Sequence, residues 1–180
     1  MTTQTMSDWN LDPTHSEAQF KVKHLVISTV TGSFNKFESH LSKENENWEN
    51  TNVTFSVDVN SIDTNNVDRD GHLKSADFFD VANHPNMTFN STEFKMTGEN
   101  IYNVTGNLTI KGVTKEVTLI ATFGGEMVDP YGNHKAGFEV TGEISRESFG
   151  LTWNAVTEAG GVVVGDNVKL TFNVQYVLNK

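Results

Sequence analysis

Apolar and polar residues alternate with a period of two along most of the chain, which predicts β-strands with one buried and one solvent-facing side. The clearest run lies near the C-terminus, where every second residue from Val168 to Leu178 is apolar and the intervening residues are mostly polar. Similar alternation occurs at residues 20–24, 53–59, 102–110, 117–123 and 138–144. Two further Phe-containing segments and several turns with Gly or Asn bring the prediction to about eight antiparallel strands.

Two segments depart from this alternation. Phe34 and Phe37 fall out of step, which predicts a β-bulge where a strand bends. Residues 66–78 carry apolar side chains near helical spacing, and they predict a short helix with Asn65 or Asn66 as its N-cap. We therefore expect an all-β fold, a closed eight-stranded antiparallel barrel with one or two short helices, because closure removes exposed strand edges.

The interior of such a barrel is either filled by its own side chains or open to one small ligand. Gly106 and Gly142 lie in the apolar register of their strands and add no side-chain volume to the interior. They predict either a cavity or positions where a neighbouring side chain packs closely. A ligand that buries about ten methylene groups would gain about 8 kcal/mol before ordering costs are subtracted.

The inward register defines a hypothetical pocket for a hydrophobic small molecule. Its expected lining residues are Phe20, Val22, Phe34, Phe37, Phe89, Val104, Leu108, Phe138, Val140, Phe149, Trp153 and Phe172. His24 shares this face, either as a core histidine bonded to the backbone or as a contact for the polar head of a ligand. Arg146 follows the register of Ile144, and we expect it to be buried or half-buried, structural and paired with Asp77 or Asp80.

Charge and composition narrow the possible partners. The 13 Lys and Arg residues against 23 Asp and Glu residues give a formal net charge of -10, which disfavours nucleic acid and anionic surfaces at long range. The absence of cysteine excludes disulfides, thiolate nucleophiles and cysteine-bound zinc. No leader-like segment and no apolar run of about 20 residues is present, so we expect a cytoplasmic protein without stable membrane insertion, or a periplasmic one if a leader was removed.

Two other kinds of chemistry are weaker alternatives. Residues 66–77 place oxygen-bearing side chains at calcium-loop positions, but Asn66 and Asp77 replace the Asp and Glu expected at the ends of such a loop. An enzyme acting on a lipid or isoprenoid, with His24 or His72 as base, is the second hypothesis, although no nucleophile motif supports it. The six histidines have no metal-binding spacing, and we predict no metal and no cofactor other than a bound lipid.

Six motifs follow one another along the chain: DPTHS at 12–16, FKVKH at 20–24, GSFNKF at 32–37, VDRDGHLKSADFFD at 67–80, GNLTIKGVT at 106–114 and RESFG at 146–150. In this order and at these spacings they resemble the YceI-like family of polyisoprenoid-binding proteins. The resemblance spans about residues 9–177, within a single domain expected at 1–180 whose residues 1–8 form a flexible tail. The last motif departs from the family's common RSDFG, and no role is inferred for its carboxylate.

The resemblance implies a lipocalin-like, extended barrel, often in a homodimer. Its lumen would hold a polyisoprenoid or a similar amphiphile, such as an isoprenoid quinone, a polyprenyl phosphate, a fatty acid or a fatty amide. The implied role is non-catalytic binding, storage or transport. Many family members carry a signal peptide, whereas this sequence begins without a leader-like segment.

Overall fold

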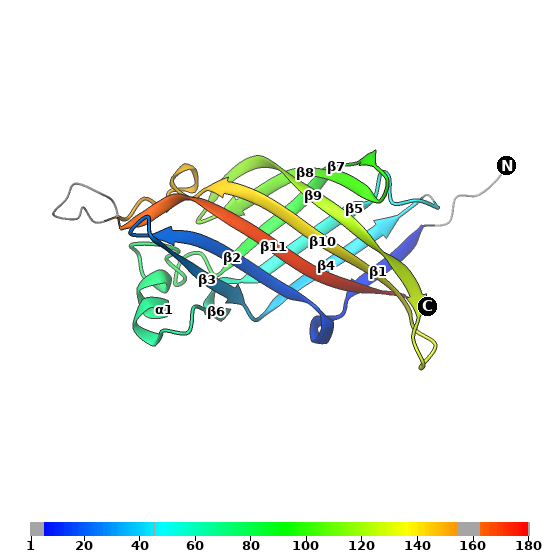
Figure 1. Ribbon diagram of the computed structural model, residues 1–180, viewed down its shortest axis with the longest axis horizontal. Helices are drawn as coiled ribbons and strands as arrows, with labels where there is room; N and C mark the ends of the chain where they lie inside the picture. Colours follow the sequence, from blue (N-terminus) through cyan, green and yellow to red (C-terminus); the bar gives the residue numbers. More distant parts are fainter. Residues whose placement is uncertain (1–5, 45, 155–162, 180) are drawn as a thin grey trace.

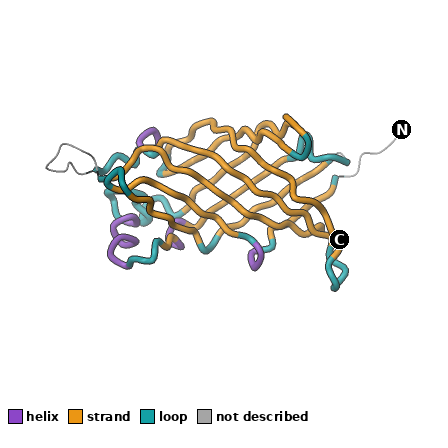
Figure 2. Tube along the Cα trace, in the orientation of Figure 1, coloured by secondary structure: helices purple, strands orange, loops and turns teal. Residues whose placement is uncertain are grey.

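The alternating segments form strands of one antiparallel sheet (Figures 1 and 2). The computed structural model describes residues 6–44, 46–154 and 163–179. The strands are β1 (Ser7–Leu11), β2 (Glu17–His24), β3 (Ser28–Phe34), β4 (Phe37–Lys43), β5 (Asn52–Asp58), β6 (Ile62–Asp63), β7 (Asn86–Gly98), β8 (Ile101–Ile110), β9 (Val113–Val128), β10 (His134–Ser145) and β11 (Val164–Leu178). One α-helix, α1 (Val67–Lys74), and three 3-10 turns, η1 (Pro13–His15), η2 (Val59–Ser61) and η3 (Glu147–Phe149), complete the elements.

The eleven strands behave as eight, because three pairs of them are halves of interrupted strands. A short break separates the two halves of each pair, which are β1 and β2, β3 and β4, and β5 and β6. One set of halves pairs in the order β1–β4–β5, and the other set pairs in the order β2–β3–β6. Both β1 and β2 pair with β11, so the first and last strands join and the sheet closes. The predicted eight-stranded closed antiparallel barrel with a helix is confirmed.

The first strand is interrupted at Asp12, whose carboxylate organises the η1 turn. It accepts a hydrogen bond from the Thr14 backbone N–H at 3.1 Å and lies 2.9 Å from Nδ1 of His15 and 3.1 Å from Nζ of Lys135. Burial by itself raises the pKa of Asp12, but the hydrogen bonds from His15, Thr14 and Lys135 outweigh it and hold the pKa well below its usual range. The break is therefore a fixed corner that ties η1 to β10.

The predicted bulge at residues 34–37 and the predicted N-terminal tail are wrong in detail. The strand breaks completely between Phe34 and Phe37, because β3 and β4 pair with different halves of the neighbouring interrupted strands. The backbone N–H of Asn35 donates to the Ser61 carbonyl of η2 at 3.2 Å. Residues 7–8 belong to β1 and pair with β4, whereas residues 1–5 of the predicted tail lie outside the described residues.

Helix α1 begins where the sequence predicts and ends sooner. Asn66 is the N-cap, and its side chain accepts a hydrogen bond from the Arg69 backbone N–H at 3.0 Å. The predicted helix continued to residue 78, but Ser75 adopts an extended conformation and donates through its hydroxyl to the His72 carbonyl at 2.6 Å. Figure 1 places α1 at one end of the barrel with the β2–β3 turn, here called the helix end, while β1 begins and β11 ends at the opposite end.

Close packing accounts for both inward glycines. A Cβ added to Gly106 would overlap the carbonyl oxygen of Asn90 and the ring of Phe89. A Cβ added to Gly142 would overlap the Leu119 side chain. Of the two explanations compatible with the sequence, the structure therefore supports close approach of a neighbour, and these glycines do not themselves create space in the lumen.

We expect Gly106→Ala to lower the free energy of unfolding by about 1–3 kcal/mol, because the added methyl group meets a rigid backbone carbonyl on the paired strand. Gly142→Ala should cost clearly less, because its main contact is the far end of the flexible Leu119 side chain. Urea unfolding of both variants measures the difference. An equal loss of stability in the two variants would show that the contact with the β7 backbone is not the reason for glycine at position 106.

Candidate functional site

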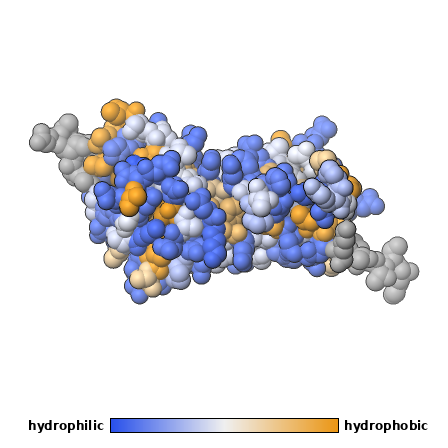
Figure 3. Space-filling view, turned by 90° about the horizontal axis from the view of Figure 1, so that it is seen from below, coloured by the Kyte–Doolittle hydropathy of each residue, from blue (hydrophilic) through white to orange (hydrophobic). Residues whose placement is uncertain are grey.

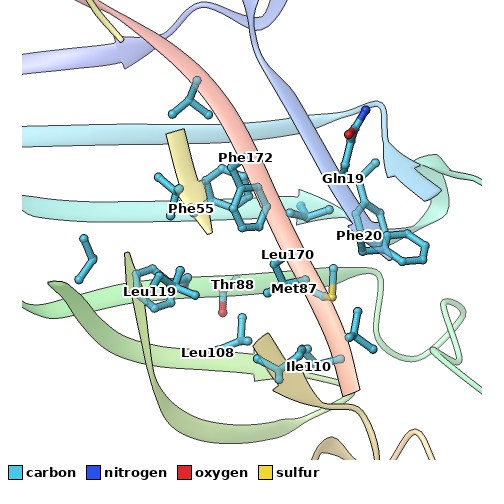
Figure 4. A pocket seen from close by; sticks show the side chains of 18 of the residues that line it. Gln19, Phe20, Phe55, Met87, Thr88, Leu108, Ile110, Leu119, Leu170 and Phe172 are labelled. Atoms are coloured by element: carbon cyan, nitrogen blue, oxygen red, sulfur yellow. The ribbon is translucent and has the colours of Figure 1, made fainter. Parts of the chain in front are cut away.

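The barrel encloses a cavity of about 180 Å³ lined almost entirely by apolar side chains. Figure 4 shows Phe55 of β5, Met87 of β7, Leu108 of β8, Leu119 of β9 and Phe172 of β11 around a common space. On β11 alone, six lining residues fall between Val164 and Tyr176. That separation corresponds to about 40 Å of strand, or about 30 Å along the axis of a barrel with ordinary strand tilt. The cavity is therefore long and narrow.

Several inward-facing residues are only partly buried although they lie inside the barrel. Leu108, Val140 and Phe172 are intermediate in exposure, in contrast to the fully buried neighbours Ala121 and Val174. All three border the cavity, so their remaining accessible surface faces the internal space. The alternative of an interior completely filled by side chains does not describe this structure.

An aromatic cluster closes the barrel at the end opposite the helix end. Trp48, which is 2% exposed, enters from the β4–β5 connection. Its ring lies 5.2 Å from that of Trp9 and 5.0 Å from that of Phe138. The ammonium group of Lys43 lies 4.1 Å from the Trp48 ring centroid. Sequence analysis did not identify Trp48, because it lies in a connection where strand alternation gives no information.

One polar side chain reaches the cavity near this closed end. The Tyr176 hydroxyl lies 2.8 Å from Oγ of Ser39, and Tyr176 lines the cavity. Burial raises the pKa of Tyr176 to about 12, and the hydrogen bond with Ser39 opposes that shift only in part. Tyr176 is therefore neutral at physiological pH and adds no charge to the apolar interior.

At the helix end, the buried Arg146 holds the surrounding loops together. Its Nε donates to the Gly165 carbonyl at 2.7 Å and its Nη2 to the Val164 carbonyl at 3.2 Å. Its Nη1 donates to the Leu151 and Trp153 carbonyls at 2.5 and 2.9 Å. Burial lowers the pKa of Arg146, while the nearby carboxylates of residues 147 and 166 raise it. The guanidinium thus joins β11 to the segment after η3.

The predicted ion pair of Arg146 is wrong, although its burial is confirmed at 3% exposure. Asp77 instead lies 2.9 Å from Nε2 of His72, and Asp80 accepts a hydrogen bond from the Asn83 side chain at 2.9 Å. The backbone carbonyls that replace a carboxylate come from the start of β11 and from the segment after η3. Strand periodicity places Arg146 at a buried position but does not show which backbone carbonyls converge there.

Nine of the thirteen residues proposed from the sequence line the cavity. They are Phe20, Val22, Phe34, Phe89, Val104, Leu108, Phe138, Val140 and Phe172. The other four do not line it. His24 lies at the base of the β2–β3 turn, where its carbonyl accepts a hydrogen bond from the Ser28 hydroxyl at 3.1 Å. Phe37 stacks on Phe55 with ring centroids 5.4 Å apart.

The two aromatic residues predicted from the RESFG region also lie outside the cavity. Phe149, 1% exposed, belongs to a second buried cluster with Ile110, Ile144 and Leu151. Trp153 packs against His72, with ring centroids 4.6 Å apart. Both follow the end of β10, where the chain leaves the sheet and the inward register no longer applies.

Other lining residues were missed by the sequence analysis. Leu73 of α1 and Phe78 and Phe79 after it contribute to the helix end of the cavity. Phe55 and Leu170 lie in the apolar registers of β5 and β11 and could have been included on that signal. The helix residues had no such signal, because their position over the barrel depends on tertiary packing.

The structure does not support the calcium or enzyme hypotheses. Residues 67–74 form a helix, and Asp70 accepts hydrogen bonds from the backbone N–H and hydroxyl of Thr64. Across residues 6–44, 46–154 and 163–179, no group of three or more His, Cys, Asp or Glu side chains could hold a metal ion. Neither His24 nor His72 lines the cavity, so neither proposed base faces that space. In the same part of the chain, no helix is long and apolar enough to cross a membrane.

Comparisons with known proteins agree with this architecture. A family model described as a YceI-like domain matches residues 9–176. A UPF0312 protein of Staphylococcus epidermidis is 39% identical over 175 residues, covering 97% of this chain and 99% of the relative. The crystal structure of Burkholderia cenocepacia BcnA has a TM-score of 0.80 at 25% identity and covers 92% of this chain and 98% of that one. A polyisoprenoid binding domain from Saccharophagus degradans has a TM-score of 0.70 at 17% identity, with coverages of 95% and 98%.

Proposed function

The chain belongs to the YceI-like family, and from this premise we propose that it binds a polyisoprenoid or similar amphiphilic lipid in its barrel for storage or transport. The observation that carries the proposal is the long cavity lined by apolar side chains. The Saccharophagus degradans domain, named for polyisoprenoid binding, shares the fold at an identity that establishes the fold alone. The proposal of a lipid ligand therefore rests on the apolar cavity of this chain.

A chain-like tail suits this interior better than a compact molecule does. The lining residues extend for about 30 Å along the barrel axis, and each buried methylene contributes about 0.8 kcal/mol. The aromatic cluster around Trp48 blocks one end, so the tail would point towards it. The polar head would remain at the helix end, where the charged Arg146 lines the cavity.

Binding without catalysis is the function that the lining residues favour. Among the residues that the structure describes, the polar side chains of the cavity wall are Gln19, Thr88, Arg146 and Tyr176. Tyr176 is held neutral, and Arg146 is engaged by four carbonyl groups, so neither is arranged as a general base. An enzyme would need a base or nucleophile close to the reacting atoms, and the described part of the wall presents neither in a suitable arrangement.

We expect affinity to rise with tail length until the cavity is filled. Protein stripped of lipid on a hydrophobic resin is titrated with prenyl quinones of increasing tail length, and the 1:1 complex is measured by native mass spectrometry. Long-tailed quinones should bind with a Kd of about 1 μM or lower, and affinity should level off once the tail exceeds about 30 Å.

The same quinone head without a tail is the control ligand and should bind at least about tenfold more weakly, because it buries few methylene groups. A head group that binds as well as the full lipid would contradict a tail-binding cavity. So would failure of the prenyl quinones to bind below about 100 μM.

A further inference from the structure

The β2–β3 turn at the helix end presents three consecutive apolar residues to solvent. Leu25, Val26 and Ile27 are 40%, 72% and 87% exposed, and we call them the apolar tip. Hydrophobic residues gather at the left-hand end of the view in Figure 3, the end that carries α1. Exposed single hydrophobic residues are common on proteins, but a contiguous apolar tip requires an explanation.

Turn geometry does not explain this composition. His24 and Ser28 pair with each other, so only the three tip residues form the loop. Leu25 and Val26 have φ angles of 54° and 66°, in the left-handed region that glycine and asparagine adopt more readily and that is unfavourable for β-branched valine. Asparagine and glycine would relieve both the backbone strain and the exposure of apolar surface. The sequence retains apolar residues where the backbone favours polar ones or glycine.

Basic residues accompany the apolar tip. Lys21 and Lys23 are exposed on β2, and Lys169 of β11 is also exposed and lies opposite Lys21 in the strand register. Within the described part of the chain, none of the three lysines forms an ion pair. Apolar side chains flanked by free lysines are the combination found in elements that lie in the interface of an anionic bilayer.

A second exposed apolar hairpin, also within the described residues, has a different charge environment. At the β9–β10 turn, Met127, Val128 and Tyr131 are 65%, 60% and 88% exposed. The carboxylates of this hairpin are paired with cations: Glu126 lies 3.5 Å from Nζ of Lys43 and 2.8 Å from Nε2 of His134, and Asp129 lies 3.6 Å from Nζ of Lys135. This hairpin therefore serves as an internal comparison with similar exposure, in which the lysines are already neutralised by carboxylates.

The apolar tip is also next to the cavity. Val22 of β2 and Val164 of β11 both line the cavity, and Val164 pairs with His24 at the base of the turn. The backbone N–H of Leu25 donates to the Val163 carbonyl at 2.8 Å, which ties the tip to the start of β11. A lipid leaving a bilayer at the tip would thus be close to the helix end of the cavity.

We propose that the apolar tip and its three lysines dock the protein on an anionic phospholipid bilayer, so that an amphiphile enters the cavity directly from the membrane. This inference rests on the proposed lipid-binding function. The net charge of -10 opposes approach at long range, but salt screens this repulsion over about 8 Å, whereas Lys23 lies only two residues from Leu25 and acts at close range. The tip touches the interface and does not span the bilayer.

Vesicle flotation tests this docking with the full chain. Vesicles of phosphatidylcholine alone and of phosphatidylcholine with phosphatidylglycerol are compared. We expect binding to both and tighter binding to the second, with the preference removed by the Lys21→Glu/Lys23→Glu variant. The Val26→Asn/Ile27→Ser variant should lower the partition coefficient by about tenfold or more, because it removes the apolar contact with the interface. The matched Met127→Ser/Val128→Ser variant should change it by less than about twofold.

Several results would overturn the docking proposal. The first is failure of the unmodified protein to bind vesicles, and the second is an equal loss of vesicle binding in the two hairpin variants. The third is a Val26→Asn/Ile27→Ser variant that is a monomer in analytical ultracentrifugation where the unmodified protein is a dimer, with unchanged vesicle binding. The last result would assign the tip to contact with a second copy. Near-UV circular dichroism of each variant confirms that it is folded. Co-purifying lipid in a protein that does not bind vesicles would leave the cavity function intact and reject docking alone.

Discussion

The Val140→Trp variant is expected to lose about 100-fold of its affinity for a long prenyl lipid while remaining folded. Val140 lies on β10 between Ala121 and Phe172 of the adjacent strands, and its side chain borders the cavity. An indole at this position would occupy the space through which a tail must run. Displacing three or four methylene groups at about 0.8 kcal/mol each gives a loss of about 3 kcal/mol.

The Glu139→Trp variant is the matched control. Glu139 is the preceding residue on the same strand, is exposed and faces outward. The Glu139→Trp substitution therefore introduces the same side chain on the outer side of the barrel wall. Its ligand affinity should equal that of the unmodified protein, as measured by native mass spectrometry. Urea unfolding should show little loss of stability in Val140→Trp, because the new ring fills existing space. Equal affinity in the two variants would mean that the ligand does not occupy the lumen.

The second large effect concerns Arg146. Replacing it with methionine should lower the free energy of unfolding by about 3–5 kcal/mol, because four backbone carbonyls would lose their donor at a buried position. The Arg146→Lys variant should recover only part of this loss, because one ammonium group cannot reach carbonyls on both β11 and the segment after η3. Urea unfolding followed by far-UV circular dichroism measures both values.

Arg69 provides the comparison for this prediction. Its guanidinium donates to the hydroxyl and carbonyl oxygens of Thr64 alone, so Arg69→Met should cost only about 1–2 kcal/mol. A loss below about 1 kcal/mol in Arg146→Met would show that the four carbonyls find water or other donors, and that Arg146 does not hold the helix end together.

Strand alternation was sufficient to predict the barrel and most of its inward face. The apolar register of β11 continues for almost the whole strand because one side faces the lumen and the other faces solvent. The helix start was predictable for a local reason, since the Asn66 side chain caps a backbone N–H only three residues away. These features depend on interactions that are short in sequence or periodic along it.

The errors come from interactions that are distant in sequence. The break between Phe34 and Phe37 reflects pairing with two halves of a neighbouring strand, and alternation alone could not distinguish it from a bulge. Gly106 is required because the β7 backbone passes closely beside it, a contact invisible in the β8 sequence. Trp48 and Trp153 lie in connections, where periodicity gives no direction for a side chain. The sequence also did not decide whether side chains fill the lumen, because that depends on how all the inward-facing side chains pack together.

Lipid extraction from freshly purified protein tests the central claim most directly. Unmodified protein, Val140→Trp and Glu139→Trp are purified in parallel, extracted with organic solvent and examined by mass spectrometry. We expect close to one long-chain amphiphile per chain from the unmodified protein and from Glu139→Trp, and a loss of about tenfold or more from Val140→Trp. Equal, trace amounts of lipid in all three samples would contradict the proposal that the barrel binds a lipid.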